Sequence, residues 1–133
     1  MKRIMTATVI GCSVACIVMF SACEKHNDHD DDPMQPVITL TLPANNQVYN
    51  NGDSVIIQGN VTDNSLHELR IRVRSGSTEL FSEEISIHDL TDYDFREGWK
   101  AVVAGATDAE VKVEAEDHGS HVVEKTVNIH INP

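Results

Sequence analysis

Residues 66–74 read L-H-E-L-R-I-R-V-R, and this stretch decides the fold class. Apolar side chains alternate there with arginines, which is the period of a β-strand that has one face buried and the other in water. The inward set is Leu69, Ile71 and Val73, and the outward set is Arg70, Arg72 and Arg74. The stretch therefore predicts a half-buried strand.

Six further runs of alternating or apolar residues are separated by turn-forming residues. They are residues 37–42, 54–62, 78–87, 93–103, 109–116 and 123–131. The spacing within 93–103 predicts an interruption near Gly98, and residues 44–53 are rich in Asn and Gly and are expected to form a loop. Seven short strands in about a hundred residues predict an all-β fold, a seven-stranded antiparallel β-sandwich.

The runs 36–42, 52–63 and 111–119, with the turn Ala115-Glu116-Asp117-His118-Gly119, resemble the immunoglobulin-like domains of bacterial surface lipoproteins. The resemblance implies an immunoglobulin-like fold but no particular activity, because such folds carry many functions. Trp99 falls late in the chain and the predicted domain has no cysteine pair, so the cadherin-like or fibronectin-like branches fit better than the antibody branch.

The amino-terminal segment has the pattern of an export signal. Lys2 and Arg3 precede an apolar run over residues 4–20, which is too short for a typical membrane span. The sequence Phe20-Ser21-Ala22-Cys23 then resembles the lipobox of bacterial lipoproteins, which implies cleavage before Cys23 and its acylation with fatty acids such as palmitate. A cleaved signal without lipid is the alternative. We therefore expect a lipoprotein signal peptide at 1–22, an acidic flexible tether at 23–35 and the sandwich domain at 36–133.

The charge of the chain is strongly negative. The formal net charge is −11 at pH 7, and loss of Lys2 and Arg3 with the signal peptide would take it to −13. Such a surface disfavours nucleic acid as a partner and would suit cations or basic partners.

Residues 24–32 of the predicted tether contain five acids and two histidines and no apolar side chain to bury. Extended, residues 23–36 would reach about 45 Å at roughly 3.3–3.6 Å per residue. An acidic stretch behind the lipidated cysteine resembles the surface-export signal of Bacteroidetes lipoproteins. That resemblance implies an outer-membrane protein exposed at the cell surface, with a periplasm-facing orientation as the alternative.

The expected topology places candidate metal ligands together. In a sandwich of this order, the second–third, fourth–fifth and sixth–seventh loops meet at one pole, where the first strand also begins. The candidate ligands are Asp63, His67, Asp117, His118 and His121. Carboxylates with carbonyl oxygens would suit Ca²⁺, and imidazoles with a carboxylate would suit Zn²⁺. The fourth–fifth loop also holds His88, Asp89 and Asp92. The competing interpretation is that Asp forms turns for backbone reasons.

Two other surface features invite a functional interpretation. The third and sixth strands are expected to be antiparallel neighbours, which would set the three arginines opposite Glu110, Glu114 and Glu116 as a cross-strand charge ladder. Asp53-Ser54-Val55 resembles the O-glycosylation acceptor of Bacteroidetes, which marks Ser54 as a candidate modification site. The plain interpretation of Ser54 is an exposed residue that starts a strand.

The sequence contains no recognisable nucleophile elbow or other catalytic motif, so we expect no enzyme activity. The first functional hypothesis is a lipid-anchored binding, adhesion or accessory module at the cell surface, with an unknown protein or glycan partner. The second is a divalent-metal protein that uses the His and Asp loops to hold Zn²⁺ or Ca²⁺; otherwise no cofactor is expected. The third is a structural spacer without a ligand.

Overall fold

The computed structural model describes residues 34–133, and in this region every regular element is a β-strand. The predicted signal peptide, Cys23 and the acidic run of the tether lie outside the described residues. The strands, in chain order, are β1 (Val37–Leu42), β2 (Gln47–Asn50), β3 (Ser54–Thr62), β4 (Leu66–Ser75), β5 (Thr78–Ser86), β6 (Asp92–Lys100), β7 (Thr107–Asp117) and β8 (Val122–Asn132).

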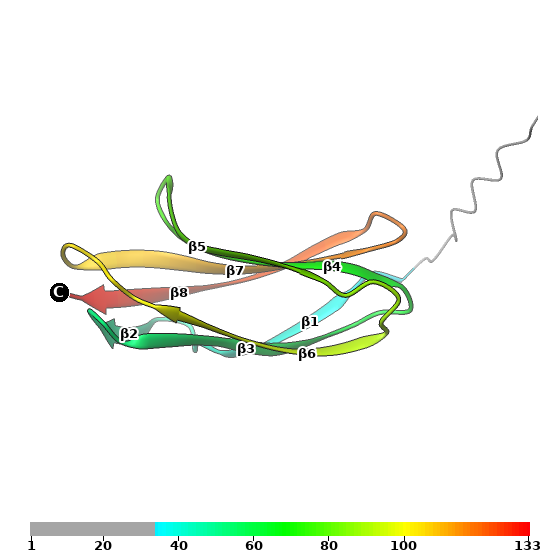
Figure 1. The fold of residues 1–133 in the computed structure, drawn as a ribbon, viewed down its shortest axis with the longest axis horizontal. Coiled ribbons are helices and arrows are strands. Elements are labelled where there is room, and N and C mark those ends of the chain that lie inside the picture. The colour runs from blue at the N-terminus through cyan, green and yellow to red at the C-terminus, as the bar shows by residue number, and fades with distance from the viewer. Residues whose placement is uncertain (1–33) are drawn as a thin grey trace, which may run out of the picture.

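The strands form two facing sheets (Figure 1). One sheet has the order β1-β3-β6 and the other β2-β8-β7-β4-β5. The strand β3 is central in the small sheet and pairs with both of its neighbours in antiparallel register. In the larger sheet β7 lies between β4 and β8, also antiparallel to both. The predicted all-β sandwich is confirmed, including the pairing of the strands expected to be third and sixth, which are β4 and β7.

Alternating apolar residues of the central strands fill the space between the sheets. In β3, β4 and β7 burial alternates along most of the strand, as the period-two pattern predicts. The fully covered side chains of these three strands are Val55, Ile57, Val61, Leu66, Leu69, Ile71, Val73, Val111, Val113 and Ala115. Phe95 and Trp99 enter the same core from β6, and Ile129 and Ile131 from β8. Because residues 34–133 contain no cysteine, packing and hydrogen bonds stabilise this domain without a disulfide.

The expectation of seven strands, all antiparallel, was wrong in one place. The turn-rich stretch 44–53 contains the short strand β2, which runs parallel to β8 with Gln47 opposite Ile129 and Asn50 opposite Asn132. Tyr49 of β2 packs against the core, and its burial, followed by the charge of Asp53, raises the pKa of its hydroxyl. Four residues with one half-buried aromatic carry too little alternation to reveal a strand in sequence.

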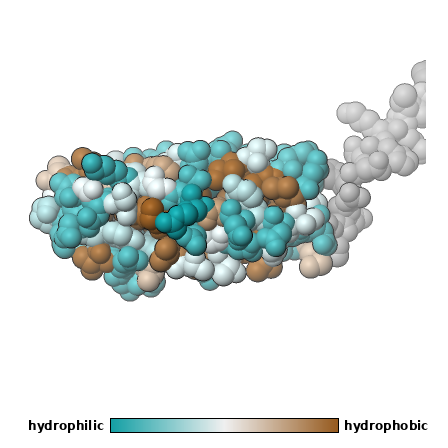
Figure 2. Space-filling view, turned by 60° about the horizontal axis from the view of Figure 1, so that its bottom comes forward, coloured by the Kyte–Doolittle hydropathy of each residue, from teal (hydrophilic) through white to brown (hydrophobic). Residues whose placement is uncertain are grey.

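The expected interruption near Gly98 is also absent. The register between β3 and β6 is continuous from Ser54 opposite Lys100 to Thr62 opposite Asp92, and Gly98 lies within it opposite Ile56. The strand instead ends at Lys100, before a loop in which Val102 is 70% exposed. The surface seen in Figure 2 carries hydrophobic side chains in small groups between hydrophilic ones.

Candidate functional site: three histidines at the loop pole

Three loops meet at the end of the sandwich where β1 begins, as the predicted topology requires (Figure 1). We call this end the loop pole: it comprises residues 63–65 between β3 and β4, residues 87–91 between β5 and β6, and residues 118–121 between β7 and β8. Backbone hydrogen bonds join the loops to one another. They are Asp63 N to Thr91 O at 3.1 Å, Leu66 N to Leu90 O at 3.1 Å, and His118 N to Ser65 O at 2.9 Å.

Three histidine rings lie together at the loop pole. His67 comes from the start of β4, His88 from the β5–β6 loop and His118 from the β7–β8 loop. The Nδ1 atoms of His67 and His88 are 3.2 Å apart, and His118 Nε2 lies 2.8 Å from the same His88 Nδ1. Ring centroids are 4.3 to 5.3 Å apart. Each of the three histidines has a ligand atom within 4.8 Å of those of the other two. Within residues 34–133, no other group of three or more His, Cys, Asp or Glu side chains meets this condition.

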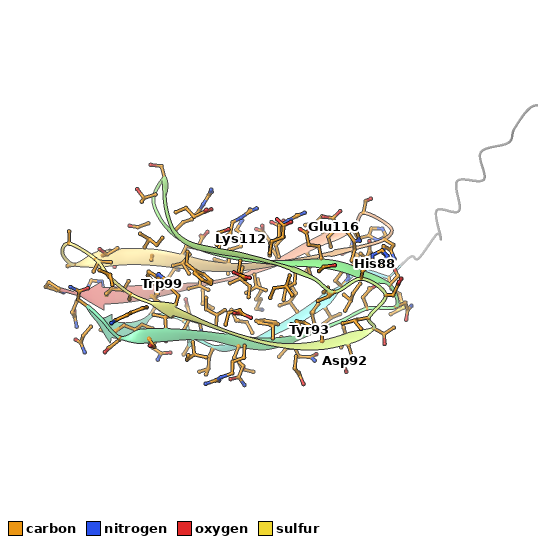
Figure 3. All side chains as sticks on the ribbon, viewed as in Figure 1. His88, Asp92, Tyr93, Trp99, Lys112 and Glu116 are labelled. Atoms are coloured by element: carbon orange, nitrogen blue, oxygen red, sulfur yellow. The ribbon has the colours of Figure 1, made fainter. Side chains whose placement is uncertain are left out.

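The fold fixes the backbone of each histidine. His67 is the second residue of β4, and its carbonyl accepts a hydrogen bond from Ile87 N at 3.2 Å, which ties it to the loop that carries His88. Ile87 is buried, so the next side chain, His88, starts from an anchored position and points outward at the end of the sandwich where β1 begins (Figure 3). His118 follows the buried Asp117 at the end of β7.

A carboxylate lies on the far side of the central ring. His88 uses Nδ1 toward the other two histidines, while its Nε2 is 3.6 Å from Asp89 Oδ2. A proton on Nε2 would face this carboxylate and leave the Nδ1 lone pair to accept from its neighbours. At 3.6 Å the contact with Asp89 is longer than a hydrogen bond, so the evidence that His88 Nδ1 faces the centre of the group is its short distances to His67 and His118.

The other sequence-predicted ligands serve the turns around the cluster. Asp117 is buried, and its Oδ1 accepts the backbone N–H of His121 at 2.7 Å, while Oδ2 lies 2.8 Å from His121 Nδ1. Asp63 is also buried, and its Oδ1 accepts the backbone N–H of Ser65 at 2.9 Å, which is an Asx-type turn. The structure thus unites His67 and His118 of the predicted set and places Asp63, Asp117 and His121 outside the group of rings.

His88 is the member that the sequence-based ligand set omits. It belongs to the fourth–fifth loop, which the expected topology brings to the same pole as the predicted ligands His118 and His121. Hydrogen bonds in the β7–β8 turn keep His121 out of the cluster, because Asp117 bonds to His121 within this turn. His118 instead faces His88 of the neighbouring loop. The useful signal was one histidine in or directly beside each of three converging loops.

Two further candidate sites have simpler settings. Ser54 is the exposed first residue of β3 and lies opposite Lys100. Its glycosylation stays a prediction. Cys23 lies outside the described residues.

The outer face of the larger sheet carries the predicted charge ladder, concentrated on one arginine. Arg70 donates to Glu114 at 3.0 Å and to Glu116 at 3.3 Å, and also pairs with Glu68. The hydrogen bond to Glu114 is the main reason why the pKa of Arg70 is raised. Lys112 and Glu116 project from the same face (Figure 3). Arg70 and Arg74 stand opposite Glu114 and Glu110 as predicted, whereas Arg72 stands opposite Lys112, so that part of the predicted ladder was wrong.

A shallow groove lies at the opposite end of the sandwich, which we call the far pole. Its volume is about 260 Å³. It lies between the β4–β5 hairpin and the β6–β7 connection, lined by Ser75, Thr78, Leu80, Val102, Val103, Ala104 and Thr107. The hairpin turn rises away from the sheets beside it (Figure 1), and β5 pairs with β4 alone at the edge of its sheet. The far pole thus combines a groove, exposed valine and an open strand edge.

Comparison with known proteins supports the fold and assigns no family. No family model and no curated protein matches the chain. Among solved structures, an engineered protein aligns over 76% of this chain and 21% of its own, with 14% identity and a TM-score of 0.55. A Paenibacillus cycloisomaltooligosaccharide glucanotransferase, solved with cycloisomaltoheptaose, aligns over 71% of this chain and 13% of its own, with 15% identity and a TM-score of 0.50.

The chain therefore spans about a fifth and an eighth of these two proteins. Fibronectin(III)-like modules of Clostridium thermocellum CbhA align over 71% of this chain and 94% of their own, at 13% identity and a lower TM-score of 0.48. The strand order and the first two likenesses together identify an immunoglobulin-like β-sandwich. Within residues 34–133, no helix is long and apolar enough to cross a membrane.

Proposed function

We propose that this protein is a lipid-anchored, non-enzymatic binding or accessory module of the outer membrane, exposed at the cell surface. The leader ending at Cys23 and the acidic segment behind it support the anchor and the address. A protein or glycan is the partner, and the strongly negative chain makes nucleic acid a poor one.

The observation that carries this proposal is the position of the far pole relative to the point where the chain enters the domain. Val37 pairs with Thr62 at the end of β3, whereas Ser54, at the start of β3, pairs with Lys100 beside the far pole. The nine residues of β3 separate the two ends by roughly 30 Å, at about 3.3 Å per residue. A tether that enters at the loop pole leaves the groove and the β5 edge on the side away from the anchor.

An open strand edge beside a groove with both polar and apolar walls is suited to recognition. Added peptide strands gain main-chain hydrogen bonds at such edges, and neighbouring pockets select side chains. Val102 is 70% exposed in the groove wall, so a charge placed there changes the surface without disturbing the core.

The proposal is tested by capture from intact cells. The native chain is expected to be acylated at Cys23 by mass spectrometry and to react with an impermeant label. It should retain a partner that Val102→Asp releases. Val122→Asp is the matched control, since Val122 is 53% exposed but starts β8 at the loop pole. An unmodified amino terminus would exclude the proposed lipid anchor. Identical recovery with both variants would exclude the far pole, and no partner at all would favour a spacer.

A second candidate function, divalent-cation binding at the loop pole, is favoured by one specific observation. A histidine at the start of β4 and one from each of two loops converge, with one ring nitrogen of each within 4.8 Å of the others. Calorimetry with Zn²⁺ and Ca²⁺ tests this function, and the absence of heat with both ions at millimolar concentration would exclude it.

A further inference from the structure

We propose that His67 Nδ1, His88 Nδ1 and His118 Nε2 form a three-nitrogen site for a late first-row transition-metal ion, with Zn²⁺ as its type. We further infer that the fourth position of that ion is open to a donor from another molecule. The inference rests on the second function proposed above and specifies its ligands and ion class. It is independent of partner recognition at the far pole.

The distances are close to those that a tetrahedral ion needs. Zinc–nitrogen bonds of about 2.0–2.1 Å place two ligand atoms roughly 3.3 Å apart in tetrahedral geometry. The His67–His88 pair, at 3.2 Å, already has this separation, and the His88–His118 pair, at 2.8 Å, must open by about half an ångström. A ring nitrogen of His67 and one of His118 lie within 4.8 Å of each other, and this pair must close by at most about 1.5 Å. Small rotations of exposed rings cover such changes.

The chemistry of the donors selects the ion. Three imidazoles suit Zn²⁺, Cu²⁺, Ni²⁺ and Co²⁺, whereas Ca²⁺ and Mg²⁺ require oxygen ligands. Asp63 and Asp117, the carboxylates that could have built a calcium site, are buried in their own turns. The Ca²⁺ alternative of the sequence analysis is therefore disfavoured at this cluster.

The scaffold holds the donors in place before an ion binds. The three backbones are connected by the hydrogen bonds from Ile87 N to His67 O and from His118 N to Ser65 O. The carboxylate of Asp89, next to the central histidine, lies 3.6 Å from its Nε2; this distance exceeds a hydrogen bond, so the backbone contacts alone hold the donors. Little chain entropy is then lost on binding, in contrast to a site on a flexible acidic segment.

The fourth position has no resident ligand in the part of the chain that the structure describes. The group consists of the three imidazoles alone. The carboxylate of Asp89 lies beside Nε2 of His88 and not beside the Nδ1 that points into the cluster. His88 and His118 are exposed, so solvent reaches the centre. Three protein ligands with an accessible fourth position is the pattern of zinc sites that accept an external ligand.

The competing explanation is a triad of neutral imidazoles that simply hydrogen-bond to one another through His88 Nδ1. Such a triad accounts for the short N···N distances and predicts no tight metal binding. The two explanations differ in measurable affinity and in the dependence of that affinity on His88.

The experiment uses the full chain in detergent micelles, titrated with Zn²⁺ and Co²⁺ by calorimetry and by visible absorption. His26→Gln/His29→Gln serves as the background, so that histidines of the acidic segment do not contribute. In this background we expect one ion per chain, at least tenfold weaker binding in His88→Gln, and no response to Ca²⁺. His121→Gln is the matched control, because His121 lies in the same pole but outside the cluster. Thermal melts without metal confirm that each variant is folded.

The open position is tested on the Co²⁺ form by adding imidazole or acetate. A four-coordinate cobalt spectrum that shifts with the added donor supports it, and a spectrum that does not respond shows a closed site and overturns that part. Equal affinity in His88→Gln and the background chain overturns the assigned ligands. Cation binding that survives this variant leaves the broader cation function standing, whereas no binding by any chain removes both.

Discussion

Gly59 offers a sharp test of how the small sheet is packed. It lies in the middle of β3, opposite Leu40 of β1 and Phe95 of β6. A Cβ atom added there would overlap the carbonyl oxygen of Thr39 and lie 2.6 Å from Phe95 Cζ. The first obstacle is backbone of a paired strand, which cannot rotate away, and the second is a ring that is 1% exposed.

The expected cost of Gly59→Ala follows from this geometry. Inserting a methyl group into a well-packed core costs about 1–3 kcal/mol, and a clash with backbone belongs at the upper end of that range. For a domain of this size, a loss of about 3 kcal/mol corresponds to a fall in Tm of roughly 12–24 °C. Trp99, the single tryptophan, is 9% exposed and reports unfolding in urea by its fluorescence.

Gly98→Ala is the matched control, because this glycine lies in β6, in the same sheet. An added Cβ there would meet only Ile56 Cδ1 at 3.7 Å, an ordinary contact. Alanine removes the extra backbone freedom of glycine in the unfolded chain, so we expect no loss and a gain of up to about 1 kcal/mol. A Gly59→Ala domain within about 0.5 kcal/mol of the parent, or equal losses in both variants, would refute this account of the β1–β3–β6 packing.

Other predictions concern charge, turn structure and metal. Arg70→Met should lower the free energy of unfolding, measured in a urea titration, by about 1–2 kcal/mol, and by less at high salt, because it leaves Glu114 and Glu116 without their shared cation. The control Arg72→Met, at a position opposite Lys112, should change this free energy by less than about 0.5 kcal/mol. Asp117→Ala should cost about 1–3 kcal/mol, since it leaves the β7–β8 turn without its buried acceptor, whereas Asp108→Ala, whose side chain is 90% exposed, should be nearly neutral; similar Tm values for the two would contradict the buried cap. Saturation with Zn²⁺ at about a hundred times its Kd should stabilise the domain by about 2.7 kcal/mol, and EDTA should return the melting curve to the metal-free one; a stabilisation that EDTA leaves in place would show that it does not come from the metal.

The sequence was sufficient for the sandwich because the middles of its central strands alternate regularly. Each inward residue of 69–73 and 111–115 is apolar and buried, and the residues between them reach solvent at least in part. Strand β2 was not predicted, because it forms by pairing with β8, more than seventy residues later, and not through any pattern within Gln47–Asn50. Local periodicity cannot report a partner that distant.

The candidate site was predictable in its location but not in its membership. The convergence of loops follows from strand order, and strand order could be inferred from the runs themselves. Which histidines meet depends on ring directions within the turns, and these were decided by Asp117 engaging His121 and by Ile87 anchoring His88. Such choices are made by single hydrogen bonds and burial of single side chains, and sequence spacing does not contain them.

The two proposed surfaces lie at opposite ends of a rigid core, and this separation limits how they can interact. Sites roughly 30 Å apart influence each other only if something between them has two arrangements. Between the poles stand the paired strands β3 and β6, with a continuous register and a filled interior, and nothing in the described region suggests a second packing. A metal ion at His88 would therefore act on whatever approaches the end of the domain where β1 begins, while a partner at Val102 would bind equally well with or without it. If partner capture at the far pole proved to require Zn²⁺, the domain would have to change its packing, and a single rigid sandwich would be the wrong description.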